Sequence, residues 1–101
     1  MEELYGKAME LITYAGNAKS LCMEALQACR ANEYDRAEEL MTEAKESLLA
    51  SHKVQTSLLV QEARGEKVEV FLLMVHAQDH LMNAITVKDL AEEMIYLHKT
   101  K

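Results

Sequence analysis

The sequence predicts an all-α fold, an antiparallel three-helix bundle. The 101 residues include no proline and only three glycines, and helix-favouring residues such as alanine, leucine and glutamate dominate. Along three stretches, apolar residues recur in alternating steps of three and four, the spacing of helix faces that pack in a bundle. A chain of this length suffices for one compact core. We therefore expect residues 1–101 to form a single domain with helices at about 2–31, 34–64 and 67–98.

Charge and cysteine usage narrow the class of protein. A formal net charge of −6 argues against a nucleic-acid partner, because such proteins need basic patches that neutralise phosphates. No apolar run approaches the ~18 residues of a membrane span, so no membrane insertion is expected. The chain opens directly in helical periodicity without the pattern of a secretion signal, and a cytoplasmic location is the expectation. Cys22 and Cys29 are separated by two helical turns on an apolar stripe, which predicts reduced core cysteines.

The first helix is expected to act as scaffold. Its apolar seam consists of Leu4, Ala8, Leu11, Ala15, Ala18, Cys22, Ala25 and Cys29. The small residues between Ala15 and Ser20 predict that a neighbouring helix approaches closely there. Gly16 costs roughly 1 kcal/mol relative to alanine inside a helix, and such close packing would explain its presence.

The second helix follows a tight turn. Asn32 is able to take the left-handed conformation that ends the first helix, and Gly65 is expected to do the same after the second. The second seam consists of Ala37, Met41, Ala44, Leu48, Ser51, Gln55, Leu58 and Glu62. It becomes polar at Ser51 and Gln55, where a core would ordinarily be apolar.

The third helix is predicted to be apolar on two faces in its first half. Leu72 and Val75 lie on one side, while a second face consists of Phe71, Met74, Leu81 and Ile85. A lone three-helix bundle buries only one face of each helix, so this pattern predicts an oligomer. The second half reads as an ordinary amphipathic helix, whose single apolar stripe consists of Val87, Leu90, Ala91, Met94 and Leu97.

Three ionisable groups meet in the same helix. His76, Asp79 and His80 are spaced i, i+3 and i+4, so they share one side of it. They follow the longest unbroken apolar run of the chain, residues 70–75, where charge is costly unless each group finds a partner. Antiparallel pairing across the two turns predicts that polar positions of all three helices lie at this height: Thr13, Asn17, His52, Thr56, His76 and His80.

Imidazole is well suited to accept and release a transferable group, since its unperturbed pKa of about 6.5 leaves a nucleophilic nitrogen free near neutral pH. His76 is the candidate nucleophile. A neighbouring group must orient its ring, and the candidates left open are Gln55, Thr56, Gln78, a second histidine and a main-chain carbonyl.

Three other interpretations fit parts of the sequence. A histidine at an apolar position is often a hydrogen-bonded core residue. His76 and His80 with Asp79 have the spacing of a metal-binding bundle, although one helix offers too few ligands for a closed site. Residues 32–37 resemble the turn of tetratricopeptide-type hairpins, which would indicate a non-catalytic helical interaction module, but no repeat with a 34-residue period continues them.

The segment Leu-Met-Val-His-Ala-Gln-Asp-His-Leu-Met at residues 73–82 resembles the signature of a known family. This is the enzyme IIA component of the lactose/cellobiose/chitobiose family of the bacterial phosphoenolpyruvate-dependent sugar phosphotransferase system (PTS). Residues 15–20, 25–26 and 51–56 extend the resemblance almost from end to end.

The resemblance implies a homotrimer, a nine-helix bundle, in which each subunit is a phosphotransferase component. His76 would accept a phosphoryl group from the phosphocarrier protein HPr and pass it to the cysteine of a cognate enzyme IIB, with the IIC permease as an indirect partner. Asp79 would lie at the trimer interface and hold a divalent ion, with Mg²⁺ expected, whereas His80, Gln78 and Gln55 would support the site. No organic cofactor is expected. The sugar would be a β-linked disaccharide, with cellobiose, chitobiose and lactose left open.

Overall fold

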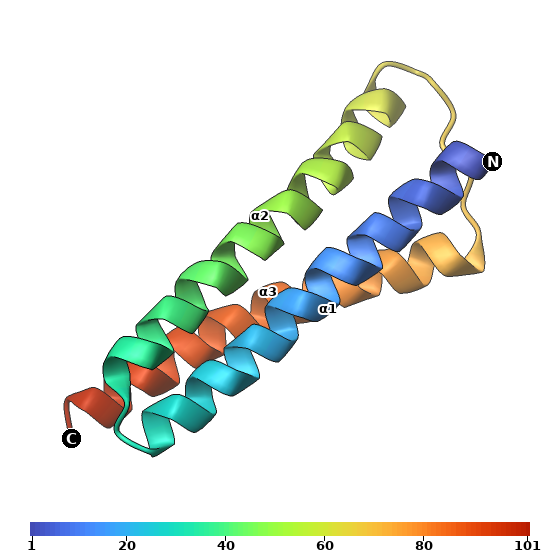
Figure 1. The fold of residues 1–101 in the computed structure, drawn as a ribbon. Coiled ribbons are helices and arrows are strands. Elements are labelled where there is room, and N and C mark those ends of the chain that lie inside the picture. Colours follow the sequence, from blue (N-terminus) through green and yellow to red (C-terminus); the bar gives the residue numbers. More distant parts are fainter.

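The computed structural model describes all 101 residues and contains three long helices and no strand. They are α1 (Glu2–Arg30), α2 (Tyr34–Ala63) and α3 (Leu72–Lys99). Figure 1 shows that α2 runs back along α1, and that α3 returns in the same direction as α1. The predicted all-α, three-helix fold is confirmed.

Both predicted helix stops are confirmed. Asn32 follows α1 with a φ of 64°, and Gly65 follows α2 with a φ of 84°. These left-handed conformations favour asparagine and glycine, because other side chains clash with the backbone there. The backbone N–H of Glu33 donates to the carbonyl of Ala28, and that of Glu66 donates to Gln61, so both turns satisfy carbonyls at the helix ends.

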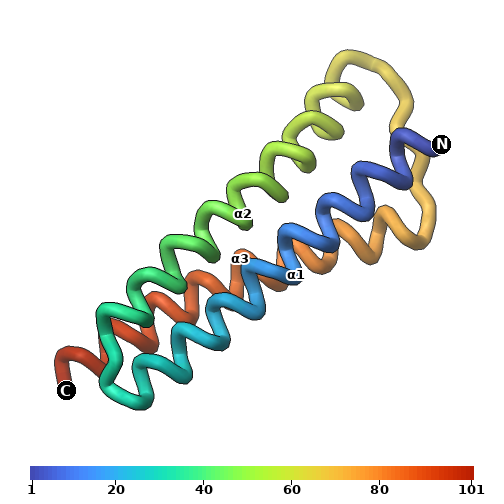
Figure 2. Tube along the Cα trace, in the orientation of Figure 1, coloured from blue at the N-terminus to red at the C-terminus, as the bar shows by residue number.

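The third helix begins later than predicted. We expected it from residue 67, whereas α3 begins at Leu72 and Phe71 is extended, with φ −141° and ψ 162°. The β-branched residues Val68 and Val70 alternate with charged ones here, a pattern that favours extended backbone over helix. Val68 packs against the core while Val70 is exposed. After the turn at Arg64 and Gly65, residues 66–71 form an extended connection across the end of the bundle, visible in Figure 2.

The core is organised around α1, which packs along both other helices, whereas α2 and α3 contact each other much less. It is divided into two clusters along the bundle. The first consists of Ala8, Leu11, Ala15, Ala18, Leu48, Leu58, Met74, Ala77, Leu81 and Ala84. The second consists of Cys22, Ala25, Ala28, Cys29, Ala37, Leu40, Met41, Ala44 and Ala91. Both cysteines are buried and free, as predicted.

The polar seam position Ser51 is fully buried between these helices. Its hydroxyl donates to the main-chain carbonyl of Leu11 across the α1–α2 contact, at 3.3 Å. A hydrogen-bonded hydroxyl can be buried at little cost. Ser51 is therefore part of the scaffold rather than of a reactive site.

The face of α3 that points away from the core is apolar along almost its whole length. In the first half, Met74 and Leu81 are buried while Leu72 is 84% exposed and Val75 is 52% exposed, which confirms the two-faced pattern. The prediction of one core-facing stripe in the second half is wrong. Ala91 is buried, but the larger members Leu90, Met94 and Leu97 are exposed. At ~100° of rotation per residue, these three lie about 60–120° around the helix from Ala91, so they share a flank of α3 that turns away from the core.

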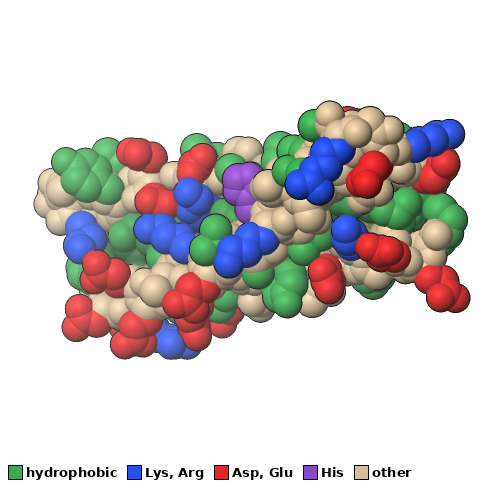
Figure 3. Space-filling view, turned by 90° about the horizontal axis from the view of Figure 1, so that it is seen from above, with side chains coloured by type: hydrophobic (Ala, Val, Ile, Leu, Met, Phe, Trp, Pro, Cys, Tyr) green, Lys and Arg blue, Asp and Glu red, His purple; other side chains and the backbone are tan.

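The outer surface carries many charged side chains. Figure 3 shows acidic and basic groups interspersed with apolar ones on one face, with acidic groups gathered toward the left end, where the α1–α2 turn lies. No helix combines the length and apolar character that a membrane span requires.

Candidate phosphoryl-acceptor site

The two histidines of α3 contact each other directly. The Nε2 atoms of His76 and His80 are 3.1 Å apart, and the rings meet edge-on with their centroids 4.5 Å apart. They are one helical turn apart, so the backbone of α3 alone places them together. His76 is exposed and His80 is half-buried. A single proton lies between the two Nε2 atoms when both rings are neutral, so one nitrogen donates and the other accepts.

The two glutamines predicted to support His76 contact each other instead. The side-chain amide of Gln55 in α2 donates to the Oε1 atom of Gln78 in α3, at 2.8 Å. Gln78 follows His76 by two residues, about 200° around the helix, so it faces α2 while His76 faces elsewhere. Of the candidates left open for orienting His76, Gln55 and Gln78 therefore do not hydrogen-bond to it within one subunit, whereas the second histidine, His80, does. The Gln55–Gln78 hydrogen bond instead joins α2 to α3.

The predicted layer of polar residues is divided into separate groups. Asn17 donates to the hydroxyl of Ser47 rather than contacting either histidine of α3. His52 lines an open cleft of about 330 Å³ between α2 and α3. Thr13 and Thr56 are exposed and make no side-chain hydrogen bond. Antiparallel pairing predicted the height of these residues along the bundle approximately. It did not predict the direction of each side chain, because residues at the same height can point to different sides of their helices.

Asp79 shares the exposed apolar face of α3. It is exposed and forms no ion pair or side-chain hydrogen bond within the subunit. The exposed side chains of Val75 and Met82 precede and follow it at one-turn spacing. No group of three or more histidine, cysteine or carboxylate side chains that would hold a metal ion occurs within one subunit. A closed metal site at Asp79 therefore requires ligands from outside this chain.

Two side chains, Cys22 and Lys88, have shifted pKa values. Burial raises the pKa of the Cys22 thiol, and the nearby charge of Glu92 raises it further against an opposing effect of Lys88. A hydrogen bond to Asp89 raises the pKa of Lys88, with a further contribution from Glu92. Lys88 lies 2.8 Å from the Asp89 carboxylate and 3.4 Å from that of Glu92. Lys45 also lies 3.6 Å from Glu92. Two cations thus balance two carboxylates, and the cluster is an ion-pair network rather than a reactive centre.

None of the larger clefts includes His76. An open cleft of about 380 Å³ lies at the far end of the bundle between Tyr34 and Lys99. A smaller apolar groove of about 200 Å³ runs between the end of α2 and the start of α3. A small-molecule site normally encloses most of its ligand. The exposed imidazole of His76 therefore suits a reaction in which another protein supplies the rest of the enclosure.

One partly apolar surface of α1 was missed by the sequence analysis. On α1, Tyr5, Met9 and Met23 are exposed, and Ile12 and Gly16 are partly exposed. Steps of three, four and seven residues relate all five, which places them on one side of the helix. We had described α1 by its core seam alone. A second heptad pattern, shifted by one residue from that seam, was the signal that would have identified this face.

Comparison with known proteins gives a consistent result. The family described as "PTS system, Lactose/Cellobiose specific IIA subunit" matches residues 6–99. The lactose-specific EIIA component of Streptococcus mutans is 47% identical over 98 residues, covering 97% of this chain and 94% of that protein. A crystal structure of the cellobiose-specific enzyme IIA from Bacillus anthracis has a TM-score of 0.95 at 49% identity, covering 99% of this chain and 92% of that one.

A further solved relative includes a partner protein. The IIA(Chitobiose)–HPr complex of Escherichia coli contains a chain with a TM-score of 0.84 and 36% identity, covering 99% of this chain and 97% of that one. The helical fold, the histidine pair in α3 and the sequence likeness over nearly the whole chain agree. The chain belongs to the lactose/cellobiose-specific IIA family of the sugar phosphotransferase system, and is thus a phosphotransferase component of that system.

Proposed function

We propose that His76 accepts a phosphoryl group from the phosphohistidine of HPr and passes it to the cysteine of a cognate enzyme IIB. The observation that carries this proposal is the exposed His76 ring, held by His80 at 3.1 Å and outside every larger cleft. Such a nucleophile is open to a protein partner and is oriented by a neighbour. The solved complex of a relative with HPr supports this choice of donor.

The transfer uses the lone pair of His76 Nε2. That nitrogen lies farther from the backbone than Nδ1 and is therefore easier for a second protein to reach. Before transfer, His76 carries its proton on Nδ1 and its Nε2 accepts from the Nε2–H of His80. Nε2 has a single lone pair, so this hydrogen bond is released as the donor phosphorus approaches and the lone pair becomes free to attack. The lone pair forms the new N–P bond as the N–P bond of the donor breaks, and the donor imidazole keeps the released electron pair. In the second transfer the thiolate of the enzyme IIB cysteine forms an S–P bond as the N–P bond of His76 breaks, and Nε2 of His76 regains its lone pair.

His80 has two tasks in this scheme. Before transfer, its N–H fixes the orientation of the His76 ring. After transfer, the same N–H is placed to donate to an oxygen of the phosphoryl group, since that group is bound to the atom it contacted before. Phosphoryl transfer depends mainly on in-line positioning and on donors for the equatorial oxygens. His80 is thus a positioning residue.

We further propose that three subunits assemble through the outward face of α3. The exposed side chains of Leu72, Val75, Met82 and Leu90 form a long apolar surface that a monomer would leave in water. A large exposed apolar patch is typical of a protein interface. In a trimer built on this face, three copies of Asp79 meet near the axis.

A divalent ion, with Mg²⁺ expected, would balance the three carboxylates. Asp79 fits that role because it has no partner in its own subunit and lies among apolar side chains, where like charges repel strongly. Carboxylate oxygens are the donors that Mg²⁺ prefers. The ion would supply charge balance for assembly, while His76 and His80 perform the transfer.

The sugar moved by the complete system is proposed to be a β-linked disaccharide. The relatives described above are named for lactose, cellobiose and chitobiose. The choice among these sugars belongs to the membrane permease IIC and to enzyme IIB, because His76 contacts only phosphoryl groups.

The test is to incubate the protein with phosphoenolpyruvate, enzyme I and HPr, then measure its intact mass and the acid stability of the product. We expect an acid-labile gain of about 80 Da. His76→Ala should not gain this mass, whereas the matched control His52→Ala, at an exposed histidine of α2, should behave as the wild type. Adding enzyme IIB should remove the group from His76. A wild type that stays unmodified, or a His76→Ala variant that gains an acid-labile phosphate, would refute the proposal.

A further inference from the structure

His76 and His80 bring two imidazole nitrogens to the spacing of a metal chelate. Their Nε2 atoms are 3.1 Å apart, and the two rings meet edge-on. An ion bound to both nitrogens at about 2.0–2.1 Å would make an N–metal–N angle of about 100° across this distance. That angle lies between the roughly 90° of square-planar and the roughly 109° of tetrahedral coordination. One ion can therefore bind both nitrogens without moving them apart.

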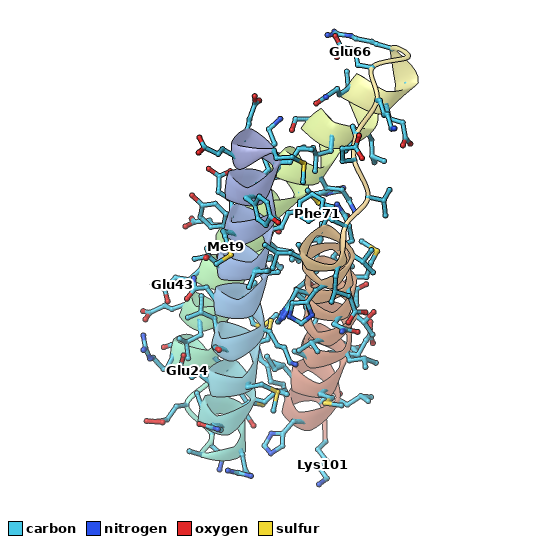
Figure 4. The ribbon with its side chains drawn as sticks, turned by 90° about the vertical axis from the view of Figure 1, so that its right-hand side faces the viewer. Met9, Glu24, Glu43, Glu66, Phe71 and Lys101 are labelled. Carbon is cyan, nitrogen blue, oxygen red and sulfur yellow. The ribbon has the colours of Figure 1, made fainter.

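The backbone of α3 holds the two rings at this spacing. The pair lies within the first three turns of α3, after Phe71, which Figure 4 labels at the start of that helix. Side chains at i and i+4 are neighbours on one helix face, so no loop has to close to bring the two nitrogens together. His80 is half-buried and His76 is exposed. The pair is thus arranged by the helix and open to an ion from solvent.

Two imidazoles favour a transition-metal ion over Mg²⁺. Neutral imidazole suits Zn²⁺, Ni²⁺ and Cu²⁺, whereas Mg²⁺ prefers oxygen ligands in near-octahedral geometry. Asp79 does not complete the site, because no three histidine, cysteine or carboxylate side chains of the subunit are grouped to hold one ion. Water would fill the remaining coordination positions. The histidine pair is therefore an open site, distinct in ligand type from the carboxylate site proposed at the subunit interface.

Metal binding needs a lone pair on both Nε2 atoms. In the metal-free pair, one Nε2 carries the proton that lies between the rings and the other accepts it. When an ion binds, that proton leaves for water and Nδ1 of the same ring takes up another. Both rings stay neutral, and two coordinate bonds replace one hydrogen bond. The exchange therefore needs no oxidant, no reductant and no net release of protons.

We infer that the His76–His80 pair chelates a divalent transition-metal ion of the Zn²⁺ class, and that this ion and the phosphoryl group exclude each other. The exclusion rests on the proposed function, because the Nε2 lone pair of His76 that would bind the ion is the one that attacks phosphorus. A phosphorylated His76 has no lone pair left on that atom. Zn²⁺ thus withdraws the unphosphorylated carrier from the reaction by mass action.

The first arm of the experiment titrates the unphosphorylated protein with ZnCl₂ in excess Mg²⁺, by calorimetry and by the ¹⁵N shifts of its four histidine rings. We expect one Zn²⁺ per subunit, with the rings of His76 and His80 shifted. His76→Ala and His80→Ala should each weaken binding at least ~10-fold, since even the loss of a group that only supports a ligand typically costs about 10- to 100-fold in metal affinity. The matched control His52→Ala, at an exposed histidine of α2, should bind as the wild type does.

The second arm measures phosphoryl acceptance from HPr with Zn²⁺ at ten times its Kd. Acceptance by the wild type should fall about 10-fold, because roughly one subunit in ten stays free of metal, and EDTA should restore it. His80→Ala retains the acceptor but not the chelate, so its own slower acceptance should not respond to Zn²⁺. This comparison separates an effect on the pair from any effect of the ion on HPr or enzyme I.

Three results would count against the inference. One ion per three subunits, or unweakened binding in both histidine variants, would assign the ion to another site and overturn the chelate. Binding at the pair with undiminished acceptance would overturn the exclusion. If the wild type accepts no phosphoryl group even without Zn²⁺, while Zn²⁺ still shifts both rings, the proposed function fails and the chelating site stands.

Discussion

The His76 and His80 rings meet through the same type of atom, Nε2, at 3.1 Å. Two neutral imidazoles in this contact cannot have the same role, so the pair has a donor and an acceptor. Which of them donates decides whether the Nε2 lone pair of His76 is available.

His80→Ala should slow phosphoryl acceptance by about 10- to 100-fold, because His76 loses the donor that fixes its tautomer and orientation. The KM for HPr should change little, since His80 is only half-buried beside the reacting atom. The ¹⁵N chemical shifts of the His76 ring should move toward those of a mixed tautomer population. Unchanged shifts together with an unchanged rate would contradict the role of His80.

Asp79→Leu should give a trimer that persists in EDTA. Replacing clustered buried charges with apolar side chains often stabilises an assembly by roughly 1–4 kcal/mol. Sedimentation equilibrium with and without chelator measures the effect. Glu24→Leu, which changes an exposed carboxylate of α1, serves as the control and should leave the response to chelator as in the wild type. If the wild type and Asp79→Leu were both monomeric at all concentrations, the proposal that three subunits assemble through α3 would be refuted.

Replacing Gly16 or Gly65 by alanine should change the stability of the protein in opposite directions. The close packing expected at Gly16 is absent within the subunit, where a Cβ atom built there meets no other atom within 4 Å. Gly16→Ala should stabilise the protein by up to ~1 kcal/mol, because alanine favours helix and its Cβ has room. Gly65→Ala should destabilise it by about 1 kcal/mol or more, since φ is +84° there. Urea unfolding followed by circular dichroism compares the two. A gain in stability for Gly65→Ala would mean that the turn relaxes to a conformation other than the one described.

Cys22 should remain unmodified by thiol reagents in the folded protein at about pH 8, because the thiolate is the reactive form and burial, with the charge of Glu92, raises its pKa. The raised pKa of Cys22 also makes the stability of the folded state depend on pH. The folded state holds this proton more tightly than the unfolded state, so the stabilising contribution is complete below the unfolded pKa of about 8.5 and is lost as pH rises through the folded value. Rapid labelling of Cys22 before unfolding would contradict this expectation, and Glu92→Gln should weaken the effect.

The sequence predicted the bounds of the first two helices to within one residue, because Asn32 and Gly65 are strong stop signals. It misplaced the start of α3, where no capping residue separates the apolar Val70 and Phe71 from the helix that follows. It also identified the His76–His80 pair, because the i, i+4 spacing brings the two together within one helix.

Contacts between helices were harder to predict. Gln55 and Gln78 were placed at the correct height, and they do meet, but not at His76. Periodicity gives the height and the core-facing side of each helix, whereas a side chain at the edge of that face turns toward one neighbour or the other according to how the helices are arranged. The order of α2 and α3 around α1 sets that choice, and no local pattern encodes it.

The division of the core into two clusters around α1 also bears on how the chain folds. The α1–α2 hairpin joins segments close in sequence across a tight turn, whereas the core contacts between α1 and α3 join the two ends of the chain. Contacts of large sequence separation carry the greater loop-closure cost and form late. The packing of α3 on α1 is therefore expected to be completed last, so a nascent or partly unfolded chain would hold the His76–His80 pair without the bundle that surrounds it.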